Sequence, residues 1–237
     1  MPVHIRAQPG DVAPIVLLPG DPGRAARVAE RLDGARCYNE NRGLLGYTGF
    51  YKGANVSVQT TGMGGPSAAI VVEELAMLGA KTVVRIGTCG ATREDIEPGD
   101  LVIATAACPL DGTTRHYLGG DAYAPAATFR VVRALVEAAE HIGVRHHVGL
   151  VATEDALYSV TPGWSETWAA RGVLAQEMEA SAVFTVAALR GLEAGCVLVA
   201  SNSAGWHERL PDDELLPAID TMIEVALEAA VALNADR

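Results

Sequence analysis

Lysine is nearly absent from the sequence: Lys52 and Lys81 are its only two lysines, and all its other basic side chains are arginines. Neither lysine follows a glycine, so the Gly-x-x-x-x-Gly-Lys-Ser/Thr loop that holds nucleoside triphosphates is missing. This absence excludes a P-loop nucleotide hydrolase. Taken singly, the arginines are most simply explained as solvated surface groups.

Cysteine is also scarce, and its spacing excludes two further kinds of site. The cysteines form no Cys-x-x-Cys pair and have no histidine at metal-ligand spacing, so we expect neither a zinc site nor a disulfide framework. They are Cys37, Cys89, Cys108 and Cys196. The first residues lack the pattern of a signal peptide, and no apolar run reaches the ~18 residues of a membrane span. We therefore expect a soluble, cytoplasmic protein with reduced thiols and no bound metal.

Basic side chains are outnumbered, 18 against 29 acidic ones, which gives a net charge of −11. This charge opposes attraction to nucleic acid or to an anionic membrane surface, so neither is expected as a partner. The imbalance lies mostly in the second half of the chain. Residues 1–120 carry 11 basic and 12 acidic groups, and residues 121–237 carry 7 and 17. An anion site is therefore expected in the first half.

The 237 residues, 49% of them apolar, are enough for one large domain spanning residues 1–237. Apolar runs and helical periodicities alternate along the chain, which predicts an α/β fold. The expected strands are 15–18, 47–51, 56–60, 82–86, 101–107, 148–153 and 196–201. The expected helices are 23–32, one from Pro66 to Gly79, 127–142, 179–191 and 212–233. The strand from Thr82 is expected to break at Gly87 and Gly90.

A glycine-rich turn at Gly62-x-Gly64-Gly65 invites a dinucleotide-binding interpretation, which two residues oppose. The third glycine of the fingerprint is replaced by Ser67, and Arg85 stands where an acidic residue would bind the ribose of NAD. A nicotinamide cofactor is therefore disfavoured. These glycines are better explained as allowing the backbone to approach another ligand.

Three arginines lie just beyond predicted strands or in adjoining loops: Arg24, Arg42 and Arg85. Planar guanidinium groups bind phosphate oxygens in a fork, and amides freed by Gly20 and by the Gly87–Thr88 segment would add donors. Together these residues predict an oxyanion site.

A pair of carboxylates, Glu177 and Glu179, opens a predicted helix. Carboxylates accept hydrogen bonds from vicinal hydroxyls, so the pair suits a sugar. Acids at a helix N-terminus also interact favourably with its dipole, so a capping pair is the competing interpretation.

Asn202 stands at the end of a late strand, where ligands of open α/β sheets collect. Its amide can donate to a carbonyl and accept from a ring N–H at the same time. An ordinary turn residue is the alternative.

Several motifs, in this order, resemble those of the nucleoside phosphorylase-I family, in its branch of hexameric bacterial purine nucleoside and uridine phosphorylases. Each motif is weak alone, but their joint order covers nearly the whole chain. They are His4, Leu-Pro-Gly-Asp-Pro with Arg24, Asn-Arg-Gly-Leu-Leu-Gly-Tyr-Thr-Gly at 41–49, Gly-Met-Gly-Gly-Pro-Ser at 62–67, Arg-Ile-Gly-Thr-Cys-Gly at 85–90, Glu-Met-Glu-Ala at 177–180 and Ser-Asn at 201–202.

The resemblance implies a mixed, twisted β-sheet that forms a barrel-like core surrounded by helices. It also implies phosphorolysis, in which orthophosphate and a nucleoside give the free base and ribose 1-phosphate, with no cofactor beyond the phosphate co-substrate. The implied assembly is a homohexamer, a trimer of dimers.

The resemblance further implies which residues hold phosphate. Gly20, Arg24, Arg85 and Thr88 would be the ligands within one subunit. Arg42 would be lent to the site across a dimer interface.

The nucleoside would rest on a second group of residues. Glu179 would accept hydrogen bonds from the ribose 2′- and 3′-hydroxyls, and a neighbouring subunit would lend His4 to the 5′-hydroxyl. The remaining contacts around sugar and base would be Met63, Tyr158, Glu177 and Met178.

The chain departs from its adenosine-accepting relatives at two positions. They have an aspartate where this chain has Asn202 and an arginine where it has Leu215. An amide cannot act as a general acid near neutral pH, but it can hydrogen-bond the oxygen of a 6-oxopurine. We therefore expect a preference for inosine and guanosine, with Asn202, Arg24 and Arg85 as the catalytic residues.

Three alternatives stay open. Uridine-cleaving relatives place a Gln-x-Arg pair against the pyrimidine, but Arg171 has no glutamine two residues before it, and only Gln176 remains as a further base contact. A nucleosidase would use water and have little use for converging arginines. A nucleoside-binding protein without catalysis would have no reason to keep phosphate ligands.

Overall fold

The protein, seen here as a computed structural model that describes residues 2–159, 161–204 and 209–235, is built on one nine-stranded mixed sheet. The strand order is β2-β3-β4-β1-β5-β8-β7-β6-β9. The strands are β1 (Ile15–Pro19), β2 (Asp33–Asn39), β3 (Gly46–Tyr51), β4 (Ala54–Gln59), β5 (Thr82–Ala91), β6 (Leu101–Pro109), β7 (His146–Thr153), β8 (Val173–Glu177) and β9 (Glu193–Ala200). The strands predicted at 47–51 and 56–60 are confirmed as β3 and β4, which pair antiparallel as a hairpin.

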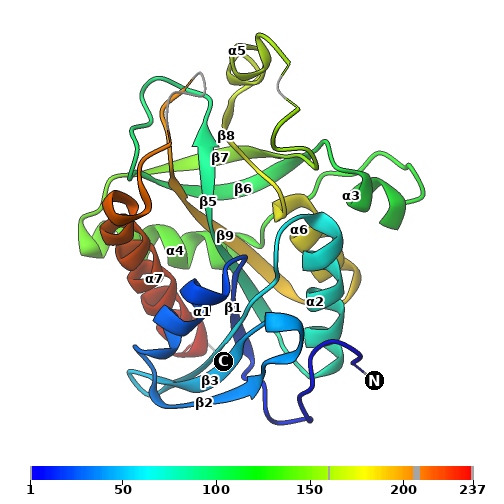
Figure 1. Ribbon diagram of the computed structural model, residues 1–237, viewed down its shortest axis with the longest axis vertical. Coiled ribbons are helices and arrows are strands. Elements are labelled where there is room, and N and C mark those ends of the chain that lie inside the picture. The colour runs from blue at the N-terminus through cyan, green and yellow to red at the C-terminus, as the bar shows by residue number, and fades with distance from the viewer. Residues whose placement is uncertain (1, 160, 205–208, 236–237) are drawn as a thin grey trace.

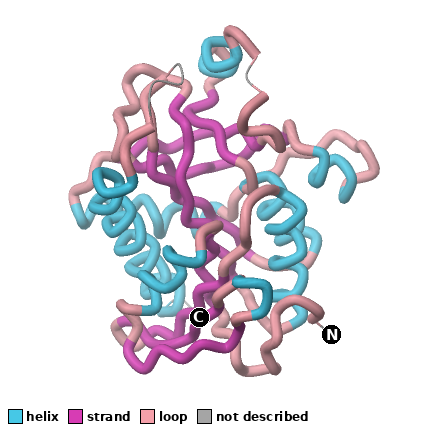
Figure 2. Tube along the Cα trace, in the orientation of Figure 1, coloured by secondary structure: helices cyan, strands magenta, loops and turns pink. Residues whose placement is uncertain are grey.

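Part of this sheet closes on itself. The last two residues of β5 pair with β8, and the rest of the strand pairs with β9. Because β8, β7, β6 and β9 also pair in this order, the five strands close into a barrel. The remaining strands extend from β5 as an outer sheet (Figure 2). The predicted α/β fold with a barrel-like mixed sheet is therefore confirmed.

The predicted break of β5 at Gly87 and Gly90 is wrong. The strand continues to Ala91, with Gly87 opposite Leu198 in β9 and Gly90 opposite Gln176 in β8. A glycine backbone pairs like any other, and glycine inside a strand often marks a close approach rather than an end. Both positions are in fact crowded by the side chains described below.

Helices cover both faces of the sheet (Figure 1). One face packs on α1 (Pro22–Ala29), α4 (Phe129–Ile142) and α7 (Asp212–Ala235), and the other on α2 (Gly65–Met77) and α6 (Ala180–Leu189). Two short helices, α3 (Gly112–Tyr117) and α5 (Trp164–Ala169), and the turn η1 (Asn41–Gly43) complete the chain. In the described segments no helix is long and apolar enough to span a membrane.

Candidate active site

The parallel strands β4 and β1 end at one edge of the sheet, beside the middle of β5, where Arg85 and Ile86 stand opposite Leu18 and Pro19. The loops after β1 and β4 touch there, because the amide of Thr61 donates to the carbonyl of Pro19 at 2.8 Å. A Cβ atom added to Gly20 would lie 3.1 Å from the carbonyl oxygen of Gly62. Ligands of open α/β sheets bind at such an edge, so the strand order itself locates a candidate site.

Arg24 reaches this edge from the first turn of α1. The helix begins at Pro22, and the Asp21 side chain caps it by accepting the backbone N–H of Arg24 at 3.0 Å. The Arg24 guanidinium donates from Nη1 to the carbonyl of Ile86 at 3.2 Å, while its buried Nε has no partner among the described residues. Burial, and then the positive charge of Arg85, lower the pKa of Arg24. Arg24 is therefore a largely buried cation that pairs with no described carboxylate, and the nearby charges of Asp21 and Glu179 only partly offset the lowering of its pKa.

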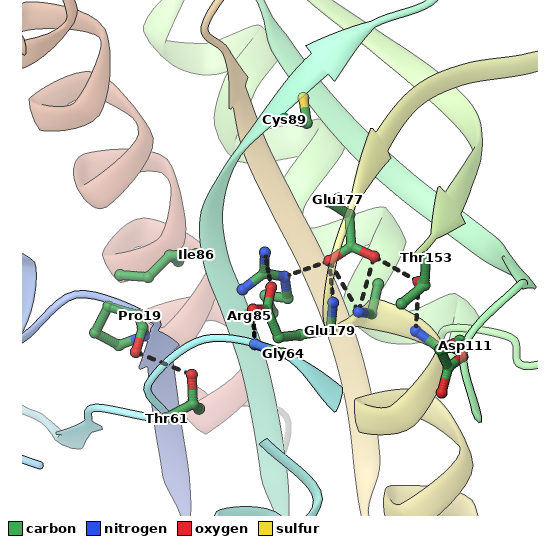
Figure 3. A network of polar contacts seen from close by, with 12 residues as sticks. Pro19, Thr61, Gly64, Arg85, Ile86, Cys89, Asp111, Thr153, Glu177 and Glu179 are labelled. Atoms are coloured by element: carbon green, nitrogen blue, oxygen red, sulfur yellow. Dashed lines mark hydrogen bonds and ion pairs between the residues drawn. The ribbon is translucent and has the colours of Figure 1, made fainter. Parts of the chain in front are cut away.

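Arg85 lies on β5 beside Arg24, and its side chain is held by two acids (Figure 3). Its Nε donates to Glu177 at 2.8 Å, and its Nη2 lies 2.5 Å from a carboxylate oxygen of Glu179. Burial alone would lower the pKa of Arg85, but the charges of Glu179 and Glu177 raise it. A Cβ atom on Gly87 would lie 2.8 Å from Nη2, so only glycine lets the guanidinium adopt this position.

Glu177 ends β8 and is fully buried. Its carboxylate accepts hydrogen bonds from the Thr153 hydroxyl at 2.5 Å and from the backbone amides of Glu179 and Ala180 at 2.8 and 2.9 Å. Burial raises the pKa of Glu177. For Glu177 the capping interpretation is therefore correct: it caps α6 and fixes Arg85, and a nucleoside contact stays a prediction.

Glu179 precedes α6, but its side chain does not cap the helix. One carboxylate oxygen accepts the backbone N–H of Gly64, at the start of α2, at 2.5 Å, and the other pairs with Arg85. A carboxylate offers about four lone-pair sites, so two contacts leave it able to accept further hydrogen bonds. The glycine turn, the arginine and this acid thus meet at one point (Figure 3).

Two amide side chains face each other across Gly90, on the barrel side of the site. A Cβ atom on Gly90 would lie 3.2 Å from Oδ1 of Asn202 and 3.6 Å from Nε2 of Gln176. The Asn202 amide donates to the carbonyl of Ser203 at 3.2 Å and is 6% exposed. Glycine at position 90 keeps the space between the two amides open.

His4 and Arg42 come together elsewhere, in a hollow of about 300 Å³ that none of the residues above lines. The side-chain amide of Asn41 donates to the carbonyl of His4 at 2.9 Å and so ties the two segments together. Arg42 itself has a positive φ of 58° in turn η1. The hollow is lined by His4, Arg42, Leu44, Pro66, Ser67, Ile70 and Val71.

The remaining predicted residues lie at different depths. Met63 and Tyr158 are 84% and 92% exposed, while Thr88 and Met178 are partly buried. Leu215, where adenosine-accepting relatives have arginine, is fully buried in the apolar core of α7 and neighbouring elements. Two contributors were missed from sequence, Thr153 and Gly90, although each stands at or near the end of a strand.

Comparisons with known proteins show the family to which the chain belongs. The Phosphorylase superfamily pattern matches residues 14–233. The chain is 46% identical, over 98% of both proteins, to the purine nucleoside phosphorylase DeoD-type of Geobacillus kaustophilus. A protein of the same name from Caldanaerobacter subterraneus subsp. tengcongensis is 43% identical over 97% of this chain and 100% of its own length. The chain therefore belongs to the phosphorylase superfamily, with relatives that are named as purine nucleoside phosphorylases.

Proposed function

We propose that the protein is a purine nucleoside phosphorylase that cleaves 6-oxopurine nucleosides, inosine and guanosine and their 2′-deoxy forms, with orthophosphate. The products are the free base and (2-deoxy)ribose 1-phosphate. The observation that carries the proposal is a pair of neighbouring guanidinium groups, the buried Arg85 on β5 and the partly buried Arg24 after the carboxyl end of β1, with Nε of Arg24 unpartnered in the described chain.

An inorganic phosphate between these arginines would supply the negative charge that Arg24 lacks. The backbone amides near Gly20 and the Thr88 hydroxyl are suited to add uncharged donors, and no further cofactor is needed. A nucleosidase that uses water would leave the Arg24 guanidinium without an ion-pair partner among the described residues. The charge arrangement therefore favours phosphorolysis over hydrolysis.

The same geometry suits the bond that breaks. The glycosidic C1′–N9 bond breaks, its electron pair leaves with the base, and a phosphate oxygen forms the new bond to C1′. Positive charge develops on the ribose in between, and a phosphate dianion held against it stabilises that charge. Glu179, with free acceptor capacity next to Arg85, would orient the sugar hydroxyls above Met178.

The amides around Gly90 support a 6-oxopurine as the leaving base. Negative charge on departing hypoxanthine or guanine spreads onto O6, where an amide N–H of Asn202 or Gln176 would stabilise it. Adenine has no O6 and needs a proton on N7, which an amide cannot supply. Leu215 is buried in the core and adds no polar group there.

A pyrimidine substrate is less well supported. Arg171, the one arginine between Tyr158 and Gln176, stacks on Trp168, with its guanidinium carbon 4.4 Å from the ring centroid. This contact holds the group at helix α5. No glutamine stands two residues before Arg171 to complete the Gln-x-Arg pair of the uridine-cleaving relatives.

The test is a panel of inosine, guanosine, adenosine and uridine, each assayed for base release with and without orthophosphate. We expect release that depends on phosphate, with kcat/KM highest for inosine and guanosine. Release without phosphate would indicate a nucleosidase. Equal or faster turnover of adenosine would refute the 6-oxopurine preference, and efficient turnover of uridine would favour the alternative.

We propose that each complete site is shared by two copies of the chain, within the hexamer that the resemblance implies. His4 and Arg42 line a hollow that neither Arg24 nor Arg85 lines, as expected if they serve the site of a neighbouring copy. Polar and apolar side chains both line the hollow, and Ile70 on α2 is 41% exposed there. A second copy placed there would receive His4 and Arg42 into its own site.

Mixing two inactive variants tests this sharing. An Arg24→Met subunit has a defective site of its own but still lends Arg42, and an Arg42→Ala subunit has the reverse defect. When equal amounts of the two variants are dissociated and reassembled at random, about half of the dimers contain one subunit of each kind. Each mixed dimer has one intact site out of two, so about a quarter of the parental activity should return. Each variant reassembled alone is the control. No recovery in the mixture would contradict the sharing.

A further inference from the structure

We infer that Glu74, a buried carboxylate on α2, is the positioning residue that aims His4 at the neighbouring subunit's nucleoside. The inference rests on the proposed function, in which His4 contacts the ribose 5′-hydroxyl. Glu74 is 5% exposed and lies 70 positions from His4 in the sequence. No sequence motif connects the two residues.

The Glu74 carboxylate is wrapped by three consecutive backbone amides. It accepts the N–H of Val3 at 2.9 Å, of His4 at 2.9 Å and of Ile5 at 2.7 Å. Successive amides arranged in this way form an anion-binding concavity. Burial alone would raise the pKa of Glu74, but the hydrogen bonds from Ile5, Val3 and His4 lower it overall, so the group is ionised at neutral pH. The clamp fixes a chain terminus, which otherwise tends to be poorly ordered.

The same carboxylate also fixes the imidazole of His4. Nδ1 of His4 lies 2.8 Å from an oxygen of Glu74. Because an ionised carboxylate only accepts, Nδ1 must carry the hydrogen, and neutral His4 then presents Nε2 as a lone-pair acceptor. An acceptor in that position suits the hydrogen of a 5′-hydroxyl. Asn41 holds the His4 carbonyl from the other side, beside Arg42 in the hollow.

The adjacent acid on the same helix provides a matched control. Glu73 pairs with the exposed Arg190 at 2.6 and 2.8 Å and makes no hydrogen bond to residues 2–5, the described start of the chain. Glu73→Gln therefore removes one carboxylate from α2 without touching the clamp. We expect it to behave as the parent protein does with every substrate.

The experiment compares Glu74→Gln with the parent protein on inosine and on 5′-deoxyinosine, which lacks the hydroxyl that His4 would contact. The glutamine amide group donates, so it cannot replace the carboxylate as acceptor for the amides and for Nδ1. We expect kcat/KM for inosine to fall about tenfold or more, a loss typical of one hydrogen bond, and kcat/KM for 5′-deoxyinosine to change less than about twofold. The ratio of the two values does not depend on how much of a preparation is folded. If Glu74→Gln does not fold, the same ratio of kcat/KM values is measured on Glu74→Asp.

A double-mutant cycle with His4→Ala completes the test. If Glu74 acts through His4, Glu74→Gln should change the substrate ratio little once His4→Ala is present. If Glu74→Gln lowered kcat/KM equally for inosine and 5′-deoxyinosine, the clamp would be merely structural and the inference would be overturned. A normal ratio in Glu74→Gln alongside a lowered ratio in His4→Ala would also overturn it. An unchanged ratio in His4→Ala would instead refute the role of His4 in the proposed function.

Discussion

Arg85→Met is expected to lower the free energy of unfolding by about 3–5 kcal/mol, because the substitution leaves buried carboxylates without their cation. Arg85 pairs with Glu177 and Glu179, whose side chains are 0% and 7% exposed. Arg24→Met should leave the free energy of unfolding unchanged or raise it, because no carboxylate in the described chain forms an ion pair with Arg24 and burial disfavours its charge. Chemical denaturation of both variants measures the difference.

Both substitutions should nevertheless impair the enzyme in the same way. Each removes a charged hydrogen bond to phosphate worth about 1.5–3 kcal/mol, so the KM for phosphate should rise about 10- to 150-fold. The two substitutions should thus differ in their effect on the free energy of unfolding but raise the KM for phosphate alike. This combination would separate phosphate binding from folding. If either variant had the same KM for phosphate as the parent protein, the substituted arginine would not belong to the proposed site.

The stability loss of Arg85→Met should also depend on pH. The pKa of Glu177 is raised in the folded state, so its ionisation destabilises the folded protein. This destabilisation is absent at a pH below the unfolded pKa of Glu177. It grows as the pH rises through the folded pKa. Arg85 offsets this cost in the parent protein. The difference in unfolding free energy between parent and variant should therefore widen as the pH rises above the unfolded pKa of a glutamate, about 4.3. A constant or narrowing difference would contradict the pairing.

Asn202→Asp is expected to shift the base preference toward adenosine. The new carboxyl would occupy a position that is 6% exposed, where burial raises the pKa of an acid and keeps it protonated nearer neutrality. A protonated carboxyl can give its proton to N7, and general acid catalysis contributes about 10²–10⁴-fold. We expect the ratio of kcat/KM for adenosine to that for inosine to rise about 100-fold or more. The gain should be larger at low pH, where more of the carboxyl is protonated.

The control for this substitution is Asn202→Ala, which removes the amide without adding an acid. It should lower kcat/KM for inosine and leave adenosine turnover slow. If Asn202→Asp behaves as Asn202→Ala does, the residue is a structural contact and not the group that selects the base.

The sequence predicted the parts of this molecule that depend on local patterns. Apolar runs ending in glycine-rich loops located the edge of the sheet at Gly20 and the arginines that follow it, Arg24 and Arg85. Strand β2 was missed because five of its seven residues are exposed and carry no apolar alternation. Strand β8 was missed because it has only five residues, too few to show an alternation of apolar and polar side chains.

The contacts that define the site could not be predicted, because they join distant segments. Glu177 and Glu179 looked alike in sequence, yet one caps α6 and the other reaches Gly64, 115 residues away. The same limit hid Glu74, whose four contacts all lie about 70 residues earlier in the chain. Only the closed barrel and the packing of α2 against α6 bring these groups together.

The most direct measurement is a crystal structure of the protein with orthophosphate and an unreactive inosine analogue. We predict one phosphate within hydrogen-bonding distance of both guanidinium groups, Arg24 and Arg85, with the ribose hydroxyls on Glu179. The account would be contradicted if the analogue were bound and no phosphate lay between the two arginines, in a crystal soaked at a phosphate concentration that saturates base release in solution.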